Sequence, residues 1–113
     1  MGWDAYANNG KIDNDEAKQA FIKASRDIQE YTGSVDGYLE HGALDIDTCA
    51  DMLHQATGKS CYDDDWSART VRDLNFIANW NFSFSQEDAW AYYSAKAFLE
   101  ICAKYSLSIN FSW

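Results

Sequence analysis

Apolar residues recur at helical spacing through residues 85–105, in two stripes that together cover more than half of the helix surface. One stripe holds Trp90, Tyr93, Ala97 and Ile101, and the other holds Ala91, Ala95, Phe98, Leu99 and Cys102. A helix of this kind packs on two sides, so we predict that it forms the hydrophobic axis of the fold. Ser85 and Asp88 have the spacing of a capping box at its start.

Further helices are predicted upstream from the same spacing. The first covers residues 15–31, with Asn14 as N-cap and Gly33 as the stop. A short helical turn is expected from Ser34 to Leu39, ending at His41-Gly42. The remaining helices are predicted at residues 48–56, between Asp47 as cap and Gly58, and at residues 68–78, after an acidic loop at residues 59–66.

Strict alternation of apolar and polar residues predicts strands at residues 80–84 and 108–113. Because they flank a helix of about 20 residues, we expect them to pair in parallel through a right-handed crossover. Residues 2–7 are a candidate third strand, followed by a turn at Asn8-Asn9-Gly10. The predicted fold is therefore α+β, a single helix-rich domain over residues 1–113 with four to five helices and a small two- to three-stranded sheet.

The composition of the chain indicates its order and its cellular compartment. Aromatic residues make up 16% of the 113 residues and proline is absent, which favours an ordered domain with a large apolar core. The start of the chain has no secretory pattern, and no apolar run approaches the roughly 20 residues of a membrane span. Three cysteines without a CxxC pair favour reduced thiols, so we expect a soluble cytosolic protein in which Cys49 and Cys102 are small core residues.

The net charge of −9 is concentrated in the middle of the chain. Residues 1–33 contain six acids and four bases, and residues 66–113 contain four of each. Residues 34–65 contain Lys59 as their one base and eight acids: Asp36, Glu40, Asp45, Asp47, Asp51, Asp63, Asp64 and Asp65. Binding of nucleic acid needs clustered Lys and Arg, so this distribution argues against nucleic acid as a direct partner and favours a basic protein.

Candidate metal and catalytic motifs are incomplete. Asn9, Gly10 and Glu16 fit a calcium-binding EF-hand loop, but Ala5 and Ala7 occupy its first ligand positions and cannot ligate. The zinc candidates Cys49, His54, Cys61 and His41 lack the close ligand pairs of zinc sites, and the aspartates are better explained as a solvated surface. No G-x-S-x-G, Walker A or H-E-x-x-H motif is present. We predict no cofactor, no metal and no catalytic residue.

The eight acids of residues 34–65 are instead predicted to form a binding surface. Asp47 and Asp51 lie one helical turn apart, about 6 Å along the axis, which is close to the separation of successive phosphates on a nucleic-acid strand. Such a surface would compete for a groove lined by Lys and Arg. The alternative explanation is an acidic composition that serves solubility alone.

The opening residues 1–6 and the runs 34–37, 47–53 and 56–58 resemble small bacteriophage-encoded accessory proteins of unassigned role. The resemblance covers scattered parts of the first two thirds of the chain and implies a bacterial cytosol. Small, acidic phage proteins without catalytic motifs are often inhibitors of host defence, anti-CRISPR proteins among them. The resemblance assigns no functional residue in this chain.

These observations lead to one expected function and two alternatives. The expected function is a non-enzymatic inhibitor that binds a basic, nucleic-acid-handling host protein by charge mimicry. The first alternative is a small-molecule or nucleotide sponge with a pocket of Trp3, Trp66, Trp80, Trp90 and Tyr92, for which Arg69 and Arg72 are the available cations. The second is a small enzyme that uses Cys49, His54 and Cys61. The sequence leaves the oligomeric state open.

Overall fold

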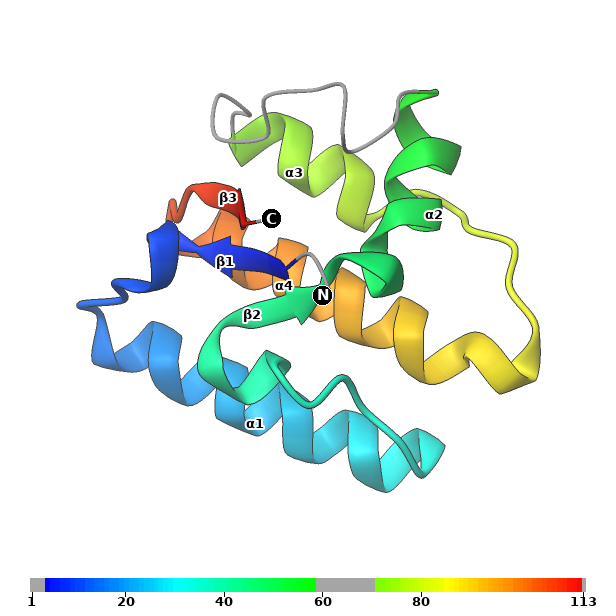
Figure 1. Ribbon diagram of the computed structural model, residues 1–113, viewed down its shortest axis with the longest axis horizontal. Coiled ribbons are helices and arrows are strands. Elements are labelled where there is room, and N and C mark those ends of the chain that lie inside the picture. The colour runs from blue at the N-terminus through cyan, green and yellow to red at the C-terminus, as the bar shows by residue number, and fades with distance from the viewer. Residues whose placement is uncertain (1–3, 59–70, 113) are drawn as a thin grey trace.

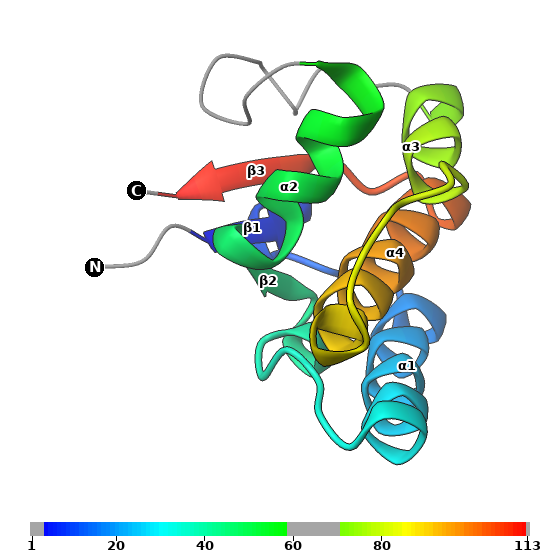
Figure 2. The same cartoon turned by 90° about the vertical axis from the view of Figure 1, so that its right-hand side faces the viewer.

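Helix α4 lies at the centre of the fold, between α1 and α3 in a layer of helices (Figures 1 and 2). The computed structural model describes residues 4–58 and 71–112. In these residues it contains four α-helices and one three-stranded sheet, which confirms the predicted α+β fold. The helices are α1 (Asp15–Thr32), α2 (Ile46–Thr57), α3 (Val71–Ala78) and α4 (Ala89–Lys104), and the strands are β1 (Asp4–Ala7), β2 (Ala43–Asp45) and β3 (Ile109–Ser112).

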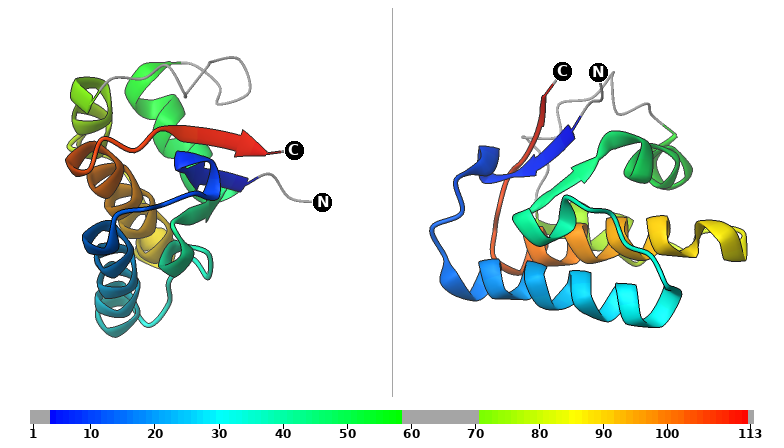
Figure 3. Two further views of the ribbon diagram at one scale, coloured as in Figure 1. Left: turned by 90° about the vertical axis from the view of Figure 1, so that its left-hand side faces the viewer. Right: turned by 60° about the horizontal axis from the view of Figure 1, so that its bottom comes forward.

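The second layer consists of the sheet together with α2 (Figure 2). In Figure 3 the sheet lies on one side of α4, while α1 and α4 run side by side in opposite directions. Helix α4 contacts α1, α2, α3 and β2, and half of its residues are buried. The buried residues are Ala89, Ser94, Ala95, Phe98, Leu99, Ile101, Cys102 and Ala103. Packing on more than one side confirms the prediction that this helix is the hydrophobic axis.

The caps predicted for α1 are present. The Asn14 side chain accepts hydrogen bonds from the backbone N–H groups of Glu16 and Ala17, at 2.9 and 3.2 Å. At the other end Gly33 adopts the left-handed conformation, with φ +86°, and its N–H bonds to the Gln29 carbonyl. Both devices satisfy backbone groups that the helix ends leave unpaired, which is why the local sequence determined this helix well.

The predicted parallel pairing of two strands around α4 is wrong. The sheet is antiparallel with the order β2-β1-β3, so the N-terminal strand lies in the centre and pairs with both others. Residues 81–85 form no strand. The Gln55 side-chain amide lies against this segment instead, accepting from the Ser83 N–H at 3.3 Å and donating to its carbonyl at 3.4 Å. The alternation of Phe82 and Phe84 places their rings against Tyr92.

Three smaller predictions also differ from the structure. The helical turn predicted from Ser34 starts later, as the 3-10 helix Leu39–His41, and it ends at Gly42 as predicted. Strand β2 was not predicted, and α2 begins directly after it at Ile46, so Asp47 lies within the helix rather than at its cap. Ser85 precedes a 3-10 turn, and its hydroxyl bonds to the Asp88 carboxylate at 3.0 Å rather than to a backbone N–H.

Gly42 is expected to be less tolerant of substitution than Gly33. Both have positive φ, +76° and +86°, but a Cβ at Gly42 would overlap Ile12 Cδ1, whereas the space around Gly33 is open. Gly33→Ala should therefore lower the free energy of unfolding by about 1 kcal/mol, the conformational penalty alone. Gly42→Ala should cost about 2 kcal/mol because Ile12 must also move. Urea unfolding measures both, and equal losses would show that the contact with Ile12 is irrelevant.

Candidate protein-binding surface

The charges of the fold separate between its two layers. Helices α1, α3 and α4 together contain six acids and six Lys or Arg residues. The four elements of the other layer, β1, β2, β3 and α2, contain no Lys or Arg, and their acids are Asp4, Asp45, Asp47 and Asp51. We call these four elements the acidic layer. Among the described helices and strands, the imbalance seen in the sequence is thus also an imbalance between the two layers.

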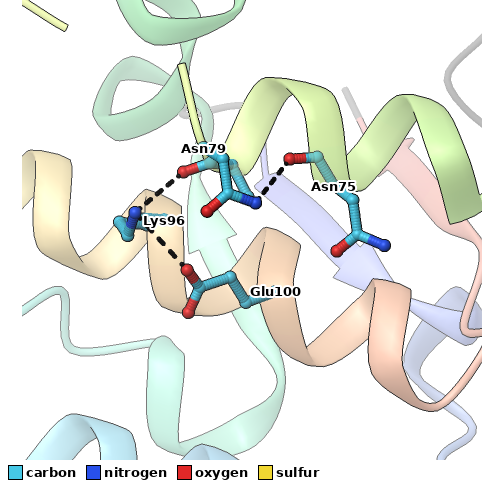
Figure 4. A network of polar contacts seen from close by, with 5 residues as sticks. Asn75, Asn79, Lys96 and Glu100 are labelled. Atoms are coloured by element: carbon cyan, nitrogen blue, oxygen red, sulfur yellow. Dashed lines mark hydrogen bonds and ion pairs between the residues drawn. The ribbon is translucent and has the colours of Figure 1, made fainter. Parts of the chain in front are cut away.

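Two of the six Lys and Arg residues in the helix layer are engaged with neighbouring acceptors. Lys23 lies 2.5 Å from the Asp27 carboxylate one turn along α1. On α4, Lys96 donates to the Ala78 carbonyl at 3.1 Å and lies 3.5 Å from Glu100, beside the Asn75–Asn79 contact of α3 (Figure 4). These contacts hold the positive charges of Lys23 and Lys96 within the helix layer.

The outer face of the sheet places two carboxylates opposite each other. Ala5 and Ala7 are buried against the helices, so Asp4 and Tyr6 point to the other face. In the register Asp4 is opposite Asp45 of β2, and like charges in such positions are unfavourable. The Tyr6 hydroxyl donates to Asp4 at 3.2 Å, and this hydrogen bond and the carboxylate charge raise the pKa of Tyr6.

Asp51 lies at the boundary between α2 and α4. Its carboxylate accepts from the Tyr92 hydroxyl and from the Gln55 amide, the latter at 3.1 Å. Partial burial raises the pKa of Tyr92 to about 12, and the hydrogen bond to Asp51 and the charge of Asp88 add to the shift. The phenol is therefore neutral over the physiological range and serves as a donor that holds the exposed carboxylate in place.

The expectation that Asp36 belongs to this surface is wrong, because the residue is only 4% exposed. Its carboxylate accepts three hydrogen bonds, from the Tyr38 N–H at 2.9 Å, the Asp45 N–H at 3.1 Å and the Thr48 hydroxyl at 2.7 Å. A buried carboxylate is stable only when its lone pairs are satisfied in this way. Asp36 therefore organises the junction of β2 and α2 and is not available to a partner.

The remaining predicted residues are distributed as follows. Glu40 is exposed on the 3-10 helix before β2, with its carboxylate 3.4 Å from His41. Asp47 occupies the first turn of α2, and its side chain lies outside the described part of the structure. The acidic loop with Asp63, Asp64 and Asp65 lies outside the described residues. Glu40, Asp45 and Asp51 thus lie on three consecutive elements, the 3-10 helix, β2 and α2. Asp4 lies opposite Asp45 in the sheet and joins the candidate surface, although it is outside the acidic stretch of residues 34–65.

The groups proposed for zinc or catalysis do not meet in the described residues. No three His, Cys, Asp or Glu side chains of residues 4–58 and 71–112 converge as a metal site. His41 and His54 are exposed, while Cys102 is buried in α4, where burial raises the pKa of its thiol and keeps it protonated. The side chain of Cys49 and all of Cys61 lie outside the described part.

Among the described residues, Trp80 and Tyr92 of the aromatic pocket predicted for a small-molecule sponge contact different rings. Trp80 packs on Phe76, with ring centroids 5.5 Å apart, whereas Tyr92 stacks on Phe84 at 4.8 Å. Trp3 and Trp66 lie outside the described residues. A hollow of about 520 Å³ does exist elsewhere, over Phe21 and beside α1, and Lys11, Lys18, Glu40 and His41 are among the residues that line it. Its mixed charge favours no particular ligand.

Comparisons with known proteins leave the surface to be interpreted from its own chemistry. The chain matches no protein-family model, no curated protein and no solved structure. Among the helices that the structure describes, none is both long and apolar enough to cross a membrane.

Proposed function

We propose that the protein is a non-enzymatic inhibitor that binds a basic, nucleic-acid-handling protein through its acidic layer and the adjoining Glu40. The observation that supports this is the separation of charge described above: four acids and no Lys or Arg in the acidic layer, against a balanced helix layer. An acidic composition that served solubility alone would not require the four elements of one layer to lack Lys and Arg. The bacteriophage and host-cytosol setting stays a prediction from the sequence.

The proposed mechanism is competition for a Lys- and Arg-lined groove. Carboxylates on the surface replace phosphates as partners of the groove and release the ions that each side had bound. Release of these ions makes binding weaken as salt rises, as it does for nucleic acid itself. The inhibitor and the nucleic acid then exclude each other from one site, without any chemical step on the inhibitor.

The test compares two variants of equal net charge. In the first, Glu40→Gln, Asp45→Asn and Asp51→Asn neutralise three acids on and beside the acidic layer. In the second, Glu16→Gln, Asp27→Asn and Glu100→Gln neutralise three acids of the helix layer. Immobilised proteins capture partners from a bacterial lysate, and duplex DNA is then added as competitor.

The unchanged chain should retain proteins that DNA displaces, and the affinity for each purified partner should fall steeply between about 50 and about 200 mM salt. The first variant should lose about tenfold or more in affinity at low salt, with a shallower salt dependence. The second should bind like the unchanged chain. Equal losses in both variants would reduce the effect to net charge and would sink the proposal, as would captured proteins that DNA does not displace.

A further inference from the structure

Five aromatic rings form a continuous row beside the acidic layer. Tyr31 at the end of α1 meets Tyr93 of α4 edge-on, with centroids 5.6 Å apart. Phe84 contacts Tyr93 at 6.0 Å and stacks on Tyr92 at 4.8 Å, and Phe82 continues the row at 6.0 Å from Tyr92. We call Tyr31, Phe82, Phe84, Tyr92 and Tyr93 the aromatic ridge. It joins segments that lie far apart in the sequence.

Two rings of the ridge are unusually exposed for aromatic side chains. Tyr31 is 78% exposed and Phe84 is 42% exposed, whereas Tyr92 and Tyr93 are half-buried beneath them. Phe82 and Phe84 belong to the segment between α3 and α4, which crosses the side of the molecule that faces the viewer in Figure 2. The half-buried rings contact the exposed ones, which lowers the cost of ordering the exposed rings on binding.

Two acids, Asp51 and Asp88, lie next to Tyr92 of the ridge. Asp51 binds the Tyr92 hydroxyl, and Asp88 lies one turn before Tyr92 at the start of α4 and acts on it electrostatically. Lys96, one turn beyond Tyr92, is directed to the Ala78 carbonyl and Glu100 on the α3 side (Figure 4). An occupant of the ridge therefore meets aromatic faces and the carboxylates of Asp51 and Asp88, while the charge of Lys96 is paired with Glu100.

This combination fits the guanidinium group of arginine better than any other side chain. A guanidinium is planar, stacks on aromatic faces and binds a carboxylate through two N–H groups at once. A lysine ammonium is a compact, strongly hydrated charge that stacks less well. Bases of a single-stranded nucleic acid also stack on aromatic rings, but their phosphates would lie beside Asp51 and Asp88.

We propose that the aromatic ridge, with Asp51 and Asp88 beside it, binds arginine side chains of a basic protein segment and selects arginine over lysine. The inference rests on the proposed function, because it names the residue type that the acidic surface recognises. It differs from that function in a testable way: charge mimicry alone requires the carboxylates and not the rings.

The test measures binding of two labelled peptides that are identical except that one carries arginine where the other carries lysine. Phe84→Leu and Tyr31→Leu retain apolar side chains but remove the aromatic faces. Phe76→Leu is the matched control, because Phe76 is 56% exposed on α3 and contacts Trp80 rather than the ridge. Circular dichroism and thermal unfolding verify that each variant is folded.

The unchanged chain should bind the arginine peptide several-fold more tightly than the lysine peptide. Each ridge variant should lose about two- to fivefold in affinity for the arginine peptide and little for the lysine peptide, with an unchanged salt dependence, because a stacked cation at an exposed ring contributes about that much. Phe76→Leu should leave both affinities unchanged.

Three outcomes would overturn the inference. Equal affinity for the two peptides would show that the ridge does not select arginine. Unchanged binding by the ridge variants, together with loss of binding in the Glu40, Asp45 and Asp51 variant, would leave the charge-based function intact and remove the ridge from it. Tighter binding of a single-stranded oligo-dT than of the arginine peptide would assign the ridge to nucleic acid, and the proposed function would fail with it.

Discussion

Asp36→Ala is expected to lower the free energy of unfolding by about 3 to 5 kcal/mol, since it removes a buried charged acceptor from three donors at once. The Asp45 N–H, the Tyr38 N–H and the Thr48 hydroxyl would all lose their partner. The backbone N–H of Asp36 itself donates to the Ser94 hydroxyl on α4, at 3.1 Å, so the same residue also ties the loop to the central helix. Urea unfolding with an unchanged m-value measures the loss.

Asp36→Asn and Glu40→Ala complete this experiment. Asparagine retains one acceptor oxygen but turns an N–H group toward some of the donors, so its cost should be smaller than that of alanine and still exceed about 1 kcal/mol. Glu40 is an exposed acid of the same region, and its removal should change stability by less than about 0.5 kcal/mol. A similar, small effect of Asp36→Ala and Glu40→Ala would refute the structural role assigned to Asp36.

Phe98→Ala should cost about 3 to 5 kcal/mol, the second large effect, because the ring is 1% exposed at the centre of the core. Phe98 lies on α4 and meets Phe21 of α1, with ring centroids 6.0 Å apart. Its removal leaves a cavity between two helices that are held on other sides by α3 and the sheet, so the layer cannot close over it completely. Thermal or urea unfolding measures the change.

Two companion variants separate burial from aromatic identity in this result. Phe98→Leu fills most of the space and should cost about 1 to 2 kcal/mol. Phe76→Ala removes an exposed ring and should stay near about 0.5 kcal/mol. In a double-mutant cycle Phe21→Ala and Phe98→Ala should be non-additive, since the two rings share one site. Additive losses would show that the two helices are stabilised independently.

The sequence by itself determined the elements whose signals are local. Asn14, the apolar stripe and Gly33 define α1 within one or two residues, and each acts on backbone groups no more than a few positions away. The two stripes of residues 85–105 predicted α4 and its central place, since a helix with apolar residues over most of its surface has to be covered. The concentration of acids in residues 34–65 was also evident from the sequence.

The pairing of the strands was decided only by the tertiary structure. Alternation indicates that a segment can be a strand but carries no information on which strand it will pair with. In the fold, Ala5 of β1 pairs with Leu44 and Phe111, which lie 39 and 106 residues further along the chain. Residues 80–84 alternate too, yet they form no strand, and the Gln55 side chain of α2 bonds to the backbone N–H and carbonyl of Ser83. Local propensity was overridden by contacts that form only in the folded chain.

The candidate surface divides in the same way. The turn at Asp36-Gly37-Tyr38 is local, because an aspartate that accepts from the N–H two residues on is a common turn. Its bonds to Asp45 and Thr48, which withdraw the charge from solvent, depend on the approach of β2 and α2. Likewise the sequence supplied the excess of acids, but only the fold placed Asp4 opposite Asp45 and gathered five aromatic rings beside Asp51. Charge and hydrophobicity are properties of residues, whereas a binding surface depends on distances between residues that the chain connects only through its folded core.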